Sequence, residues 1–417
     1  MRVNFGYDKG VQSVEIPDKN LIGILSANEI QYDRTGTEAV RFALSHPIGQ
    51  PRLSKNVRPG MKIAVVTSDI SRPLPGREVI PAILDELFLS GVSPEDVTVV
   101  FALGSHRPHT EDEKRFLVGD RVFETVRCVD SDPNDCVRLG VTKRGTPVDI
   151  TRSVAEADYK IAVGNVEFHY FAGYSGGSKA LMPGVSTVEA IRANHRMMTD
   201  ENALAGKLTG NPIREDIEEA GEIAGLDSIV NVVLDEHKRI VFAVSGDKIK
   251  AHRVACAFLD QMYRVPIRKK ADIVLVSQGG APKDANLYQT QKALENAKYA
   301  VKPGGTIILI GSCKEGLGSR TFEAWLKEAA SPEDLIKRVR EQFELGGHKA
   351  AAIALVLRSA RVILVSDLDP ELVKRIFLIP AGSAAEAFDE ALSIAGPDAS
   401  VIAMPFGGAT LPVIQNG

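Results

Sequence analysis

The sequence has few of the features that mark a secreted, membrane or nucleic-acid-binding protein. Its four cysteines, Cys128, Cys136, Cys256 and Cys313, are scattered and form no close pairs of the kind found in zinc sites or disulfide frameworks. No apolar run approaches the roughly 18 residues that cross a bilayer, and the first ten residues contain no apolar core of a secretory signal. The net charge of −4 lacks the basic surplus of a nucleic-acid-binding protein. We therefore expect a cytoplasmic protein.

What the chain does contain is the rhythm of an α/β protein. Its 417 residues, 44% of them hydrophobic, are enough for two domains. Buried-strand runs without alternation, such as 61–67 and 97–103, are followed by a polar loop and a helical pattern. This alternation of strands and helices is interrupted near residue 266 and starts again with a strand pattern at 271–277. We predict mainly parallel, helix-flanked sheets in an N-terminal domain, 1–266, and a C-terminal domain, 267–417.

Three polar loops, at 68–73, 104–109 and 164–179, each follow a predicted strand. In doubly wound sheets ligands bind at the carboxyl ends of the strands, so these loops mark the candidate site. His106 and His169 lie in them, and His195 lies on the predicted helix 187–198. Because imidazole is the usual proton shuttle and a common metal ligand at neutral pH, three histidines at one edge favour a function.

The other histidines give weaker signals. His109 is a neighbour of His106 and could replace it in its role. His46, His237 and His252 lie on predicted helices or turns without polar company, and we predict them at the surface.

The stretch from Gly164 to Arg196 holds two of the three histidines, a glycine-rich turn and Lys179. Such a turn between strand and helix exposes backbone N–H groups that suit an anion. It departs from a phosphate loop, because Ser178 stands where the second glycine belongs and Ala180 where a hydroxyl should hold magnesium. A plain turn with a solvated lysine remains an alternative.

Further polar candidates are isolated. Arg72 follows a strand, where a guanidinium can hold a carboxylate at two points or simply pair with Asp69. Tyr288, Gln289 and Lys292 lie at a predicted helix start, where solvation alone would explain them. There is no HExxH motif, facial triad or cysteine pair, so a metal held only by side chains is not expected.

Taken in order, SDISRP, GSHRP, HYFAGYSGGSKALMPG, ANHR and YQTQK resemble the nickel-pincer lactate racemase family over nearly the whole chain. The resemblance implies two α/β domains with the active site in the cleft between them. It also implies a nickel-pincer nucleotide, a pyridinium-3,5-bisthiocarboxylic acid mononucleotide that binds nickel, built by separate maturation enzymes. The SGGSK match makes Lys179 its covalent attachment point, and the ANHR match makes His195 the nickel ligand.

The same resemblance assigns the remaining roles. It makes His106 and His169 the two acid–base residues, and Arg72 and Lys292 the substrate-binding residues. The residues that it places against the cofactor are Asp69, Ser175, Gly176, Gly177, Tyr288 and Gln289. The reaction it implies is inversion of a 2-hydroxy acid at its α-carbon by reversible hydride transfer. Each histidine would serve the hydroxyl of one enantiomer, at a pKa that imidazole offers without large tuning.

The sequence departs from the family pattern near the expected substrate. Lactate-specific members have a tryptophan near the substrate in the second domain, whereas Trp325 here lies on a predicted amphipathic helix, where it would pack in the core. The segment 346–349, GGHK, offers polar groups instead. We therefore expect either lactate or a larger, more polar 2-hydroxy acid. The alternatives are a non-catalytic cofactor carrier or sensor and a nucleotide-dependent transferase.

Overall fold

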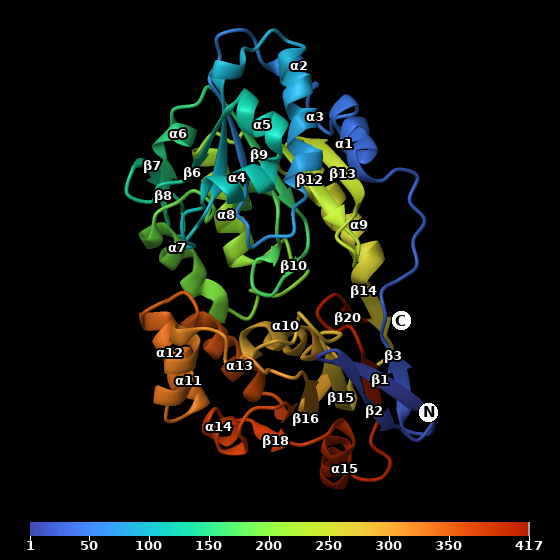
Figure 1. Cartoon of the computed structure of the whole chain (residues 1–417). Helices are drawn as coiled ribbons and strands as arrows, with labels where there is room; N and C mark the ends of the chain where they lie inside the picture. The colour runs from blue at the N-terminus through green and yellow to red at the C-terminus, as the bar shows by residue number, and fades with distance from the viewer. Residues whose placement is uncertain (416–417) are drawn as a thin grey trace. The chain divides into compact units, whose positions relative to one another are not determined.

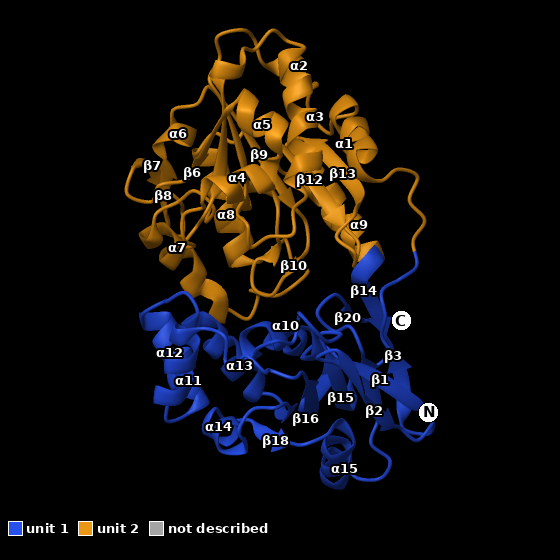
Figure 2. Ribbon diagram, in the orientation of Figure 1, with its two compact units in different colours: residues 1–29, 262–417 blue, residues 30–261 orange. Residues whose placement is uncertain are grey.

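The computed structural model describes residues 1–415, and the chain divides into two compact units (Figure 2). Unit 2 comprises residues 30–261, and unit 1 comprises residues 1–29 and 262–417. The chain passes from unit 2 back to unit 1 after residue 261, five residues before the end of the N-terminal domain predicted at 266. The first 29 residues, predicted to belong with the N-terminal domain, lie in the unit built by the C-terminal part of the chain. The reason is long-range pairing: β3 (Leu21–Ile24) pairs in parallel with β19 (Val401–Met404).

Unit 2 is built on a six-stranded sheet in the order β13-β12-β9-β4-β5-β6 (Figure 1). All neighbours are parallel except β12 and β13, which form an antiparallel pair. The central strand β4 is continuously apolar and buried, as expected for a sheet covered on both faces. The strands are β4 (Ile63–Ser68), β5 (Val97–Ala102), β6 (Arg127–Asp130), β9 (Tyr159–Asn165), β12 (Ser228–Leu234) and β13 (Ile240–Gly246).

Helices of unit 2 begin where the sequence supplies caps. Thr110 and Glu113 form a reciprocal capping box at α4, and Asn211 caps α8 by accepting two backbone N–H groups. Helices α1 and α3 pack together beside the sheet and contribute to its main core cluster. The helices are α1 (Gly36–Ser45), α2 (Leu53–Asn56), α3 (Gly76–Phe88), α4 (Glu111–Val118), α5 (Asp120–Thr125), α6 (Arg152–Ala155), α7 (Val188–His195), α8 (Pro212–Ile223) and α9 (Lys250–Tyr263), which ends in unit 1.

Shorter elements complete unit 2. An antiparallel pair, β7 (Cys136–Val141) with β8 (Pro147–Thr151), was not anticipated from the sequence. A two-residue pair, β10 (Phe168–His169) with β11 (Gly173–Tyr174), closes a tight loop directly after β9. The 3₁₀ turns are η1 (Pro94–Asp96), η2 (Gly177–Ala180) and η3 (Arg196–Thr199). The predicted glycine-rich turn is therefore a hairpin followed by η2.

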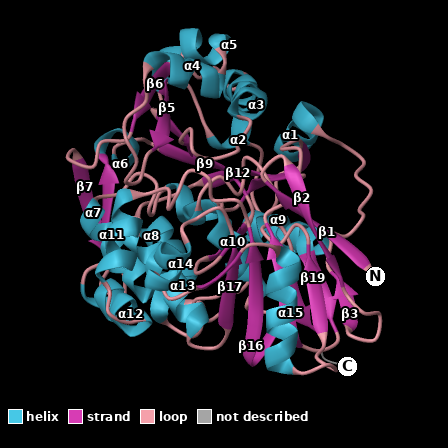
Figure 3. Ribbon diagram, turned by 60° about the horizontal axis from the view of Figure 1, so that its bottom comes forward, coloured by secondary structure: helices cyan, strands magenta, loops and turns pink. Residues whose placement is uncertain are grey.

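Unit 1 has a six-stranded, wholly parallel sheet in the order β18-β17-β16-β15-β19-β3 (Figure 3). The hairpin β1 (Arg2–Tyr7) with β2 (Gly10–Glu15) and helix α15 (Ala384–Ala395) pack beside this sheet and share its core cluster. The other strands are β15 (Ala271–Ser277), β16 (Val301–Ile310), β17 (Arg361–Val365) and β18 (Ile379–Ala381), and a separate parallel pair joins β14 (Arg264–Ile267) to β20 (Leu411–Ile414).

The remaining helices of unit 1 are α10 (Leu287–Ala297), α11 (Arg320–Glu328), α12 (Pro332–Glu341), α13 (Gly347–Leu357) and α14 (Pro370–Arg375). Helix α10 starts at Leu287, one residue before Tyr288, because Asn286 caps it by accepting from the Gln289 N–H. Among residues 1–415, no helix combines the length and apolarity that crossing a membrane requires.

Trp325 lies in the core of unit 1, as predicted. It is 1% exposed, its Nε1 donates to Glu344 at 2.9 Å, and the Arg338 guanidinium lies 4.4 Å from its ring centroid. The start of α13 packs directly on this ring, since a Cβ at Gly347 would lie 2.2 Å from it. Glycine at 347 therefore permits the contact between α13 and the tryptophan.

Gly347→Ala should destabilise unit 1, by about 1–3 kcal/mol as for other overpacked cores. Because Trp325 is the only tryptophan, its fluorescence during urea unfolding reports this contact directly. Gly10→Ala is a suitable control, because a Cβ there would meet nothing closer than 3.8 Å. Equal unfolding midpoints for the two variants would show that the tryptophan can move aside.

Candidate active site

The three predicted loops leave one edge of the unit 2 sheet. Strands β5 and β9 both flank β4 in parallel, so the loops that follow all three strands start at the same edge. The loop after β4 carries Asp69 and Arg72, the loop after β5 carries His106, and the segment after β9 carries His169 and Lys179. The sequence prediction that these loops share an edge is confirmed.

Asp69 and His106 form a close pair across two of these loops. His106 Nδ1 lies 2.6 Å from Asp69 Oδ2, and the Ser71 hydroxyl donates to Asp69 Oδ1 at 2.9 Å. The carboxylate is almost fully buried, whereas the His106 side chain is about one-third exposed. A carboxylate at Nδ1 keeps the proton on that nitrogen, so the neutral ring presents Nε2 as a base.

The charge on Asp69 is stabilised by its neighbours. Burial opposes ionisation, but the hydrogen bonds from His106 and Ser71 outweigh it and hold the Asp69 pKa below its ordinary value. A carboxyl whose pKa is lowered on folding adds stability above its unfolded pKa, about 3.9, and this stability disappears as the pH falls through the folded pKa.

Asp69→Asn should therefore lower the free energy of unfolding at pH 7, by about 1–3 kcal/mol for a buried charged hydrogen bond. The difference from the wild type should shrink as the pH falls below about 4 and disappear below the lowered pKa of folded Asp69, where the wild-type carboxyl is also neutral. Urea unfolding at several pH values measures it. A difference that stays constant down to the lowest pH would mean that the Asp69 charge contributes nothing.

His109 lies beside this pair in a different role. Its Nδ1 lies 2.6 Å from Asp130 Oδ1, and its Nε2 accepts the Ile70 N–H at 3.1 Å. Both ring nitrogens are thus used, Nδ1 to join the loop after β5 to the end of β6 and Nε2 to join it to the loop after β4. This geometry favours His106 over His109 as the acid–base residue.

His169 and His195 meet at one aromatic side chain. Phe171 packs edge-on against both rings, with centroids 4.5 Å from His169 and 4.9 Å from His195. His169 Nδ1 accepts the Ala172 N–H at 3.2 Å, so the proton of the neutral ring lies on Nε2. Loss of hydration, followed by the charge of Lys179, holds the His169 pKa well below its ordinary value. His169 is thus the neutral, proton-donating partner of the pair.

Lys179 lies in η2, on the same segment. Loss of hydration, with the charges of Arg72 and Arg214, lowers its pKa to about 7. A large fraction of this amine is therefore unprotonated at neutral pH, and an unprotonated amine is nucleophilic. The structure thus brings Arg72, Lys179 and His195 within electrostatic range of His169.

The glycine-rich segment does not present an open cradle of amides. The N–H of Ser175 donates to Glu167 O, that of Gly177 to Asn231 Oδ1, and that of Lys179 to Gly176 O. The Ser175 hydroxyl donates to Asn165 O and accepts the Glu167 N–H. The expected anion site made of these backbone groups is therefore not supported. Cofactor contacts by Ser175, Gly176 and Gly177 stay predictions.

His252 corrects one sequence prediction. It was expected at the surface, but it is 1% exposed and its Nε2 donates to Ser175 O at 2.8 Å. Its ring also packs on Gly177, which has a φ of +61° and where a Cβ would lie 3.1 Å from the ring. His252 thus packs against the backbone at 175–177, just before Lys179. His46 and His237 are exposed, as predicted.

Tyr288, Gln289 and Lys292 lie in the first turns of α10 in unit 1. The Lys292 side chain is exposed, and Tyr288 and Gln289 are half-buried. Lys349, at the start of α13, donates to Tyr288 O at 2.9 Å and lies 3.7 Å from the centroid of its ring. The polar segment 346–349 therefore lies directly against a residue of the predicted site.

Comparison with known proteins matches residues 7–206 to the lactate racemase N-terminal domain and residues 267–411 to the lactate racemase C-terminal domain. A lactate racemase of Thermoanaerobacterium thermosaccharolyticum is 34% identical over 97% of both chains. One of Lactiplantibacillus plantarum is 32% identical over 97% of this chain and 98% of its own. The chain belongs to the lactate racemase family. It is accordingly a racemase, an isomerase.

Solved structures agree with this assignment. The lactate racemase apoprotein of T. thermosaccharolyticum covers all of both chains with a TM-score of 0.89 and 32% identity. A Thermotoga maritima protein covers 93% of this chain and all of its own, with a TM-score of 0.67 and 18% identity, which shows a shared fold. The two-domain α/β architecture predicted from the sequence is thereby confirmed for this lactate racemase family member.

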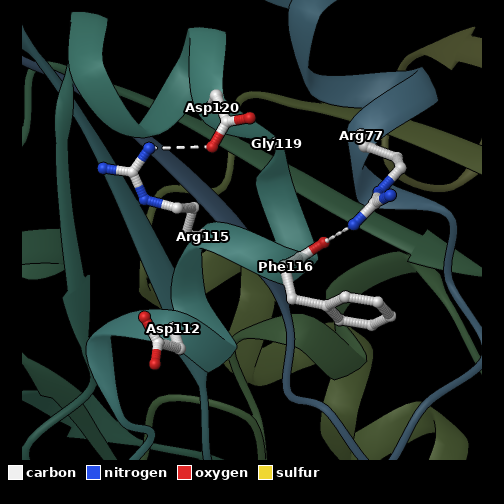
Figure 4. Close-up of a pocket in the computed structure, with 6 residues that line it drawn as sticks. All are labelled: Arg77, Asp112, Arg115, Phe116, Gly119 and Asp120. Atoms are coloured by element: carbon white, nitrogen blue, oxygen red, sulfur yellow. Dashed lines mark hydrogen bonds and ion pairs between the residues drawn. The ribbon is translucent and has the colours of Figure 1, made fainter.

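A hollow elsewhere in unit 2 does not compete with this site. It lies among α3, α4 and α5, and none of the predicted site residues lines it (Figure 4). Its two arginines are already engaged, because Arg115 pairs with Asp120 at 2.8 Å and Arg77 donates to Phe116 O. The carboxylates of Asp112 and Asp120 also line this hollow, which disfavours a small anionic substrate there.

Sequence reasoning missed a group of residues that hold the site together. Asn194 precedes His195, and Arg214 and Asp216 lie in the first turns of α8; all three are fully buried. The segment Asn211-Pro212 was interpreted only as a helix start. The available signal was a run of polar residues on a helix face that packs inward, and only long-range contacts show what they bind.

Proposed function

We propose that this lactate racemase family member inverts a 2-hydroxy acid with a nickel-pincer nucleotide bound covalently to Lys179. The observation that carries the proposal is the cluster around Phe171, where His169 and His195 meet within electrostatic range of Lys179. It supplies an amine for attachment, an imidazole for the metal and an imidazole for proton transfer on one short stretch of chain.

The chemistry of these residues fits such a group. An amine with a pKa of about 7 can attack an activated carboxyl of the cofactor. His195 Nδ1 donates to Asn194 Oδ1 at 2.9 Å, which leaves Nε2 as the nitrogen with the metal-binding lone pair. Among residues 1–415, no three His, Cys, Asp or Glu side chains gather to hold a metal. The other nickel ligands would then come from the cofactor.

Reversible hydride acceptance is the chemistry that the group supplies when bound. His106 and His169 would exchange the hydroxyl proton, one for each enantiomer. In this structure His106 presents Nε2 as a base and neutral His169 presents Nε2–H as a donor, which suits turnover of one enantiomer. Turnover of the other enantiomer requires the two rings to exchange these forms. Loss of hydride from the substrate would leave a planar 2-keto acid, which could be reduced from either face. Cofactor contacts by Asp69, Tyr288 and Gln289 belong to the same proposal.

Arg72 would hold the substrate carboxylate. Its Nε lies 4.0 Å from Asp69 Oδ1, beyond a strong hydrogen bond, and its side chain is about half exposed. The loose ion pair leaves the guanidinium able to form a two-point contact with a second carboxylate. Lys292 is proposed to bind substrate as well, since its exposed ammonium is suited to a carboxylate or carbonyl oxygen.

The substrate is proposed to be lactate, after the named relatives, or a larger and more polar 2-hydroxy acid. The second choice is favoured by Trp325, which is committed to the core, and by Lys349, which lies against Tyr288. A panel of single-enantiomer 2-hydroxy acids, followed by loss of optical activity, tests both. Fastest turnover of lactate would exclude the larger substrate, and no turnover of any member would contradict the proposed function.

Cofactor-building enzymes are the proposed partners, in the cytoplasm. The four cysteines are free, which agrees with a reducing compartment. The alternative of a nucleotide-dependent transferase is not favoured, because three amides of the glycine-rich segment are already hydrogen-bonded within the protein. A thermal-shift screen with magnesium and nucleoside triphosphates distinguishes the two.

A further inference from the structure

Helix α8 contacts both halves of the proposed cofactor site. Three buried residues of its cap and first turns, Asn211, Arg214 and Asp216, are each 0% exposed and are called the α8 hub below. The hub touches the segment that leads to Lys179 on one side and the residue that holds His195 on the other. None of these residues has a role in the chemistry described above.

The first arm of the α8 hub binds the backbone of the Lys179 segment. Asn211 Nδ2 donates to Phe171 O at 2.9 Å, and Arg214 Nε donates to Ala172 O at 3.1 Å. The two terminal nitrogens of the Arg214 guanidinium donate to Tyr174 O and Gly176 O. Four carbonyls between 171 and 176 therefore converge on one helix start.

The central residue of this arm is an arginine, whose charge is unfavourable to bury. A buried charge must recover its lost hydration from strong hydrogen bonds. Loss of hydration lowers the Arg214 pKa to about 10, so the guanidinium remains charged at neutral pH. Its planar fork can meet three carbonyls together, which a lysine ammonium on a flexible stem does not reproduce. The arrangement fixes the hairpin from which His169 and Lys179 extend.

The second arm of the α8 hub reaches the metal-binding histidine. Asp216 Oδ2 accepts from Asn194 Nδ2 at 2.7 Å, and Thr142 donates to Asp216 Oδ1 at 2.5 Å. This bond fixes the Asn194 amide so that its Oδ1 faces His195 Nδ1, at 2.9 Å. Residues that orient a metal-bound imidazole in this way commonly contribute 10–100-fold to metal affinity.

We propose that the α8 hub sets the position of Lys179 relative to His195, with Arg214 as the positioning residue for cofactor attachment and Asp216, acting through Asn194, as the positioning residue for nickel. The inference rests on the proposed function. Because the two arms are separate, attachment and nickel binding should be separable by mutation. A scaffold that only stabilised the fold would lose both together.

The test uses full-length protein co-produced with the cofactor-building enzymes and nickel, and it measures the Lys179 adduct by mass and nickel per adduct by elemental analysis. Arg214→Gln should lower the adduct fraction about tenfold or more, since a misplacement of about 1 Å costs on the order of 100-fold in rate. Arg214→Lys should be intermediate. The matched control, Arg144→Gln, removes an ion pair to Glu215 of α8 without a contact to the segment, and should load normally.

For the histidine arm, Asn194→Leu and Asp216→Leu should keep the adduct but lower nickel per adduct about 10–100-fold. Asp216→Asn should have normal nickel per adduct, unlike Asp216→Leu, because its amide oxygen still accepts from Asn194. Asn20→Leu, which removes another buried asparagine that binds only backbone carbonyls, controls for destabilisation. Adduct and nickel falling in parallel in both arms, or normal loading in all hub variants, would overturn the proposal.

A readout on cofactor-free protein separates this inference from the proposed function. Histidine ¹⁵N NMR should show His195 protonated on Nδ1 in the wild type and in Asp216→Asn, and shifted toward the other tautomer in Asn194→Leu. Hydrogen exchange of 172–179 should rise in Arg214→Lys. An unchanged tautomer and unchanged exchange would contradict the hub even if the wild type carried the adduct. Changes in both with an unloaded wild type would contradict only the proposed cofactor.

Discussion

The His106→Ala and His169→Ala proteins should each lose racemisation by about 10²–10⁴-fold, the usual contribution of a positioned acid–base group. Every turnover uses both histidines, one to take the hydroxyl proton and one to return it. The equilibrium constant of a racemisation is one, so kcat/KM must fall equally in both directions. A comparison of kcat/KM in the two directions therefore does not show which histidine serves which enantiomer.

A single-turnover experiment supplies that information. Each variant retains one histidine and should still oxidise the one enantiomer whose hydroxyl faces it. We expect quenched reactions of His106→Ala and His169→Ala to release 2-keto acid from opposite enantiomers. His237→Ala, at an exposed site, should behave as the wild type. Near-normal racemisation by either variant, or keto acid from the same enantiomer in both, would remove that histidine from the assigned role.

Lys179→Ala should lose the covalent cofactor and with it all measurable racemisation, a decrease of more than about 10³-fold, since the residues of the chain alone offer no hydride acceptor. Lys179→Arg should fail in the same way, because a guanidinium keeps the charge but is not a nucleophile at neutral pH. The lowered pKa of Lys179 is the physical reason that we expect attachment at this lysine.

Lys160→Met provides the control for the lysine variants. Lys160 is also buried in unit 2, and its Nζ donates to Ala157 O at 2.8 Å. The Lys160→Met protein should keep the adduct on Lys179 and its racemase activity. Cofactor retained by Lys179→Ala, or bound without a covalent bond at full activity, would contradict the assignment of the attachment site.

Local signals in the sequence predicted much of this structure. Strands such as β4 were evident because a parallel strand covered on both faces shows an apolar run without polar alternation. The shared edge of the three loops followed from strand direction alone. His106, His169 and Lys179 were proposed as site residues because they stand where ligands bind in such sheets.

The errors and omissions have a common cause, which is dependence on contacts distant in sequence. His252 lies on an amphipathic helix, and nothing nearby shows that its ring meets Gly177 and Ser175 O. Arg214 has a charged side chain in an ordinary helix start, and its burial is explained only by carbonyls about 40 residues earlier. Strand β3 pairs with β19, a strand that begins only at Val401.

The central claim is the covalent cofactor on Lys179, and an intact-mass spectrum with peptide mapping tests it most directly. The protein should be co-produced with the cofactor-building enzymes and nickel. We predict a mass increase that maps to the peptide containing Lys179 and to no other lysine. An unmodified Lys179 in protein prepared in this way would contradict the account, and the cluster around Phe171 would then need another ligand.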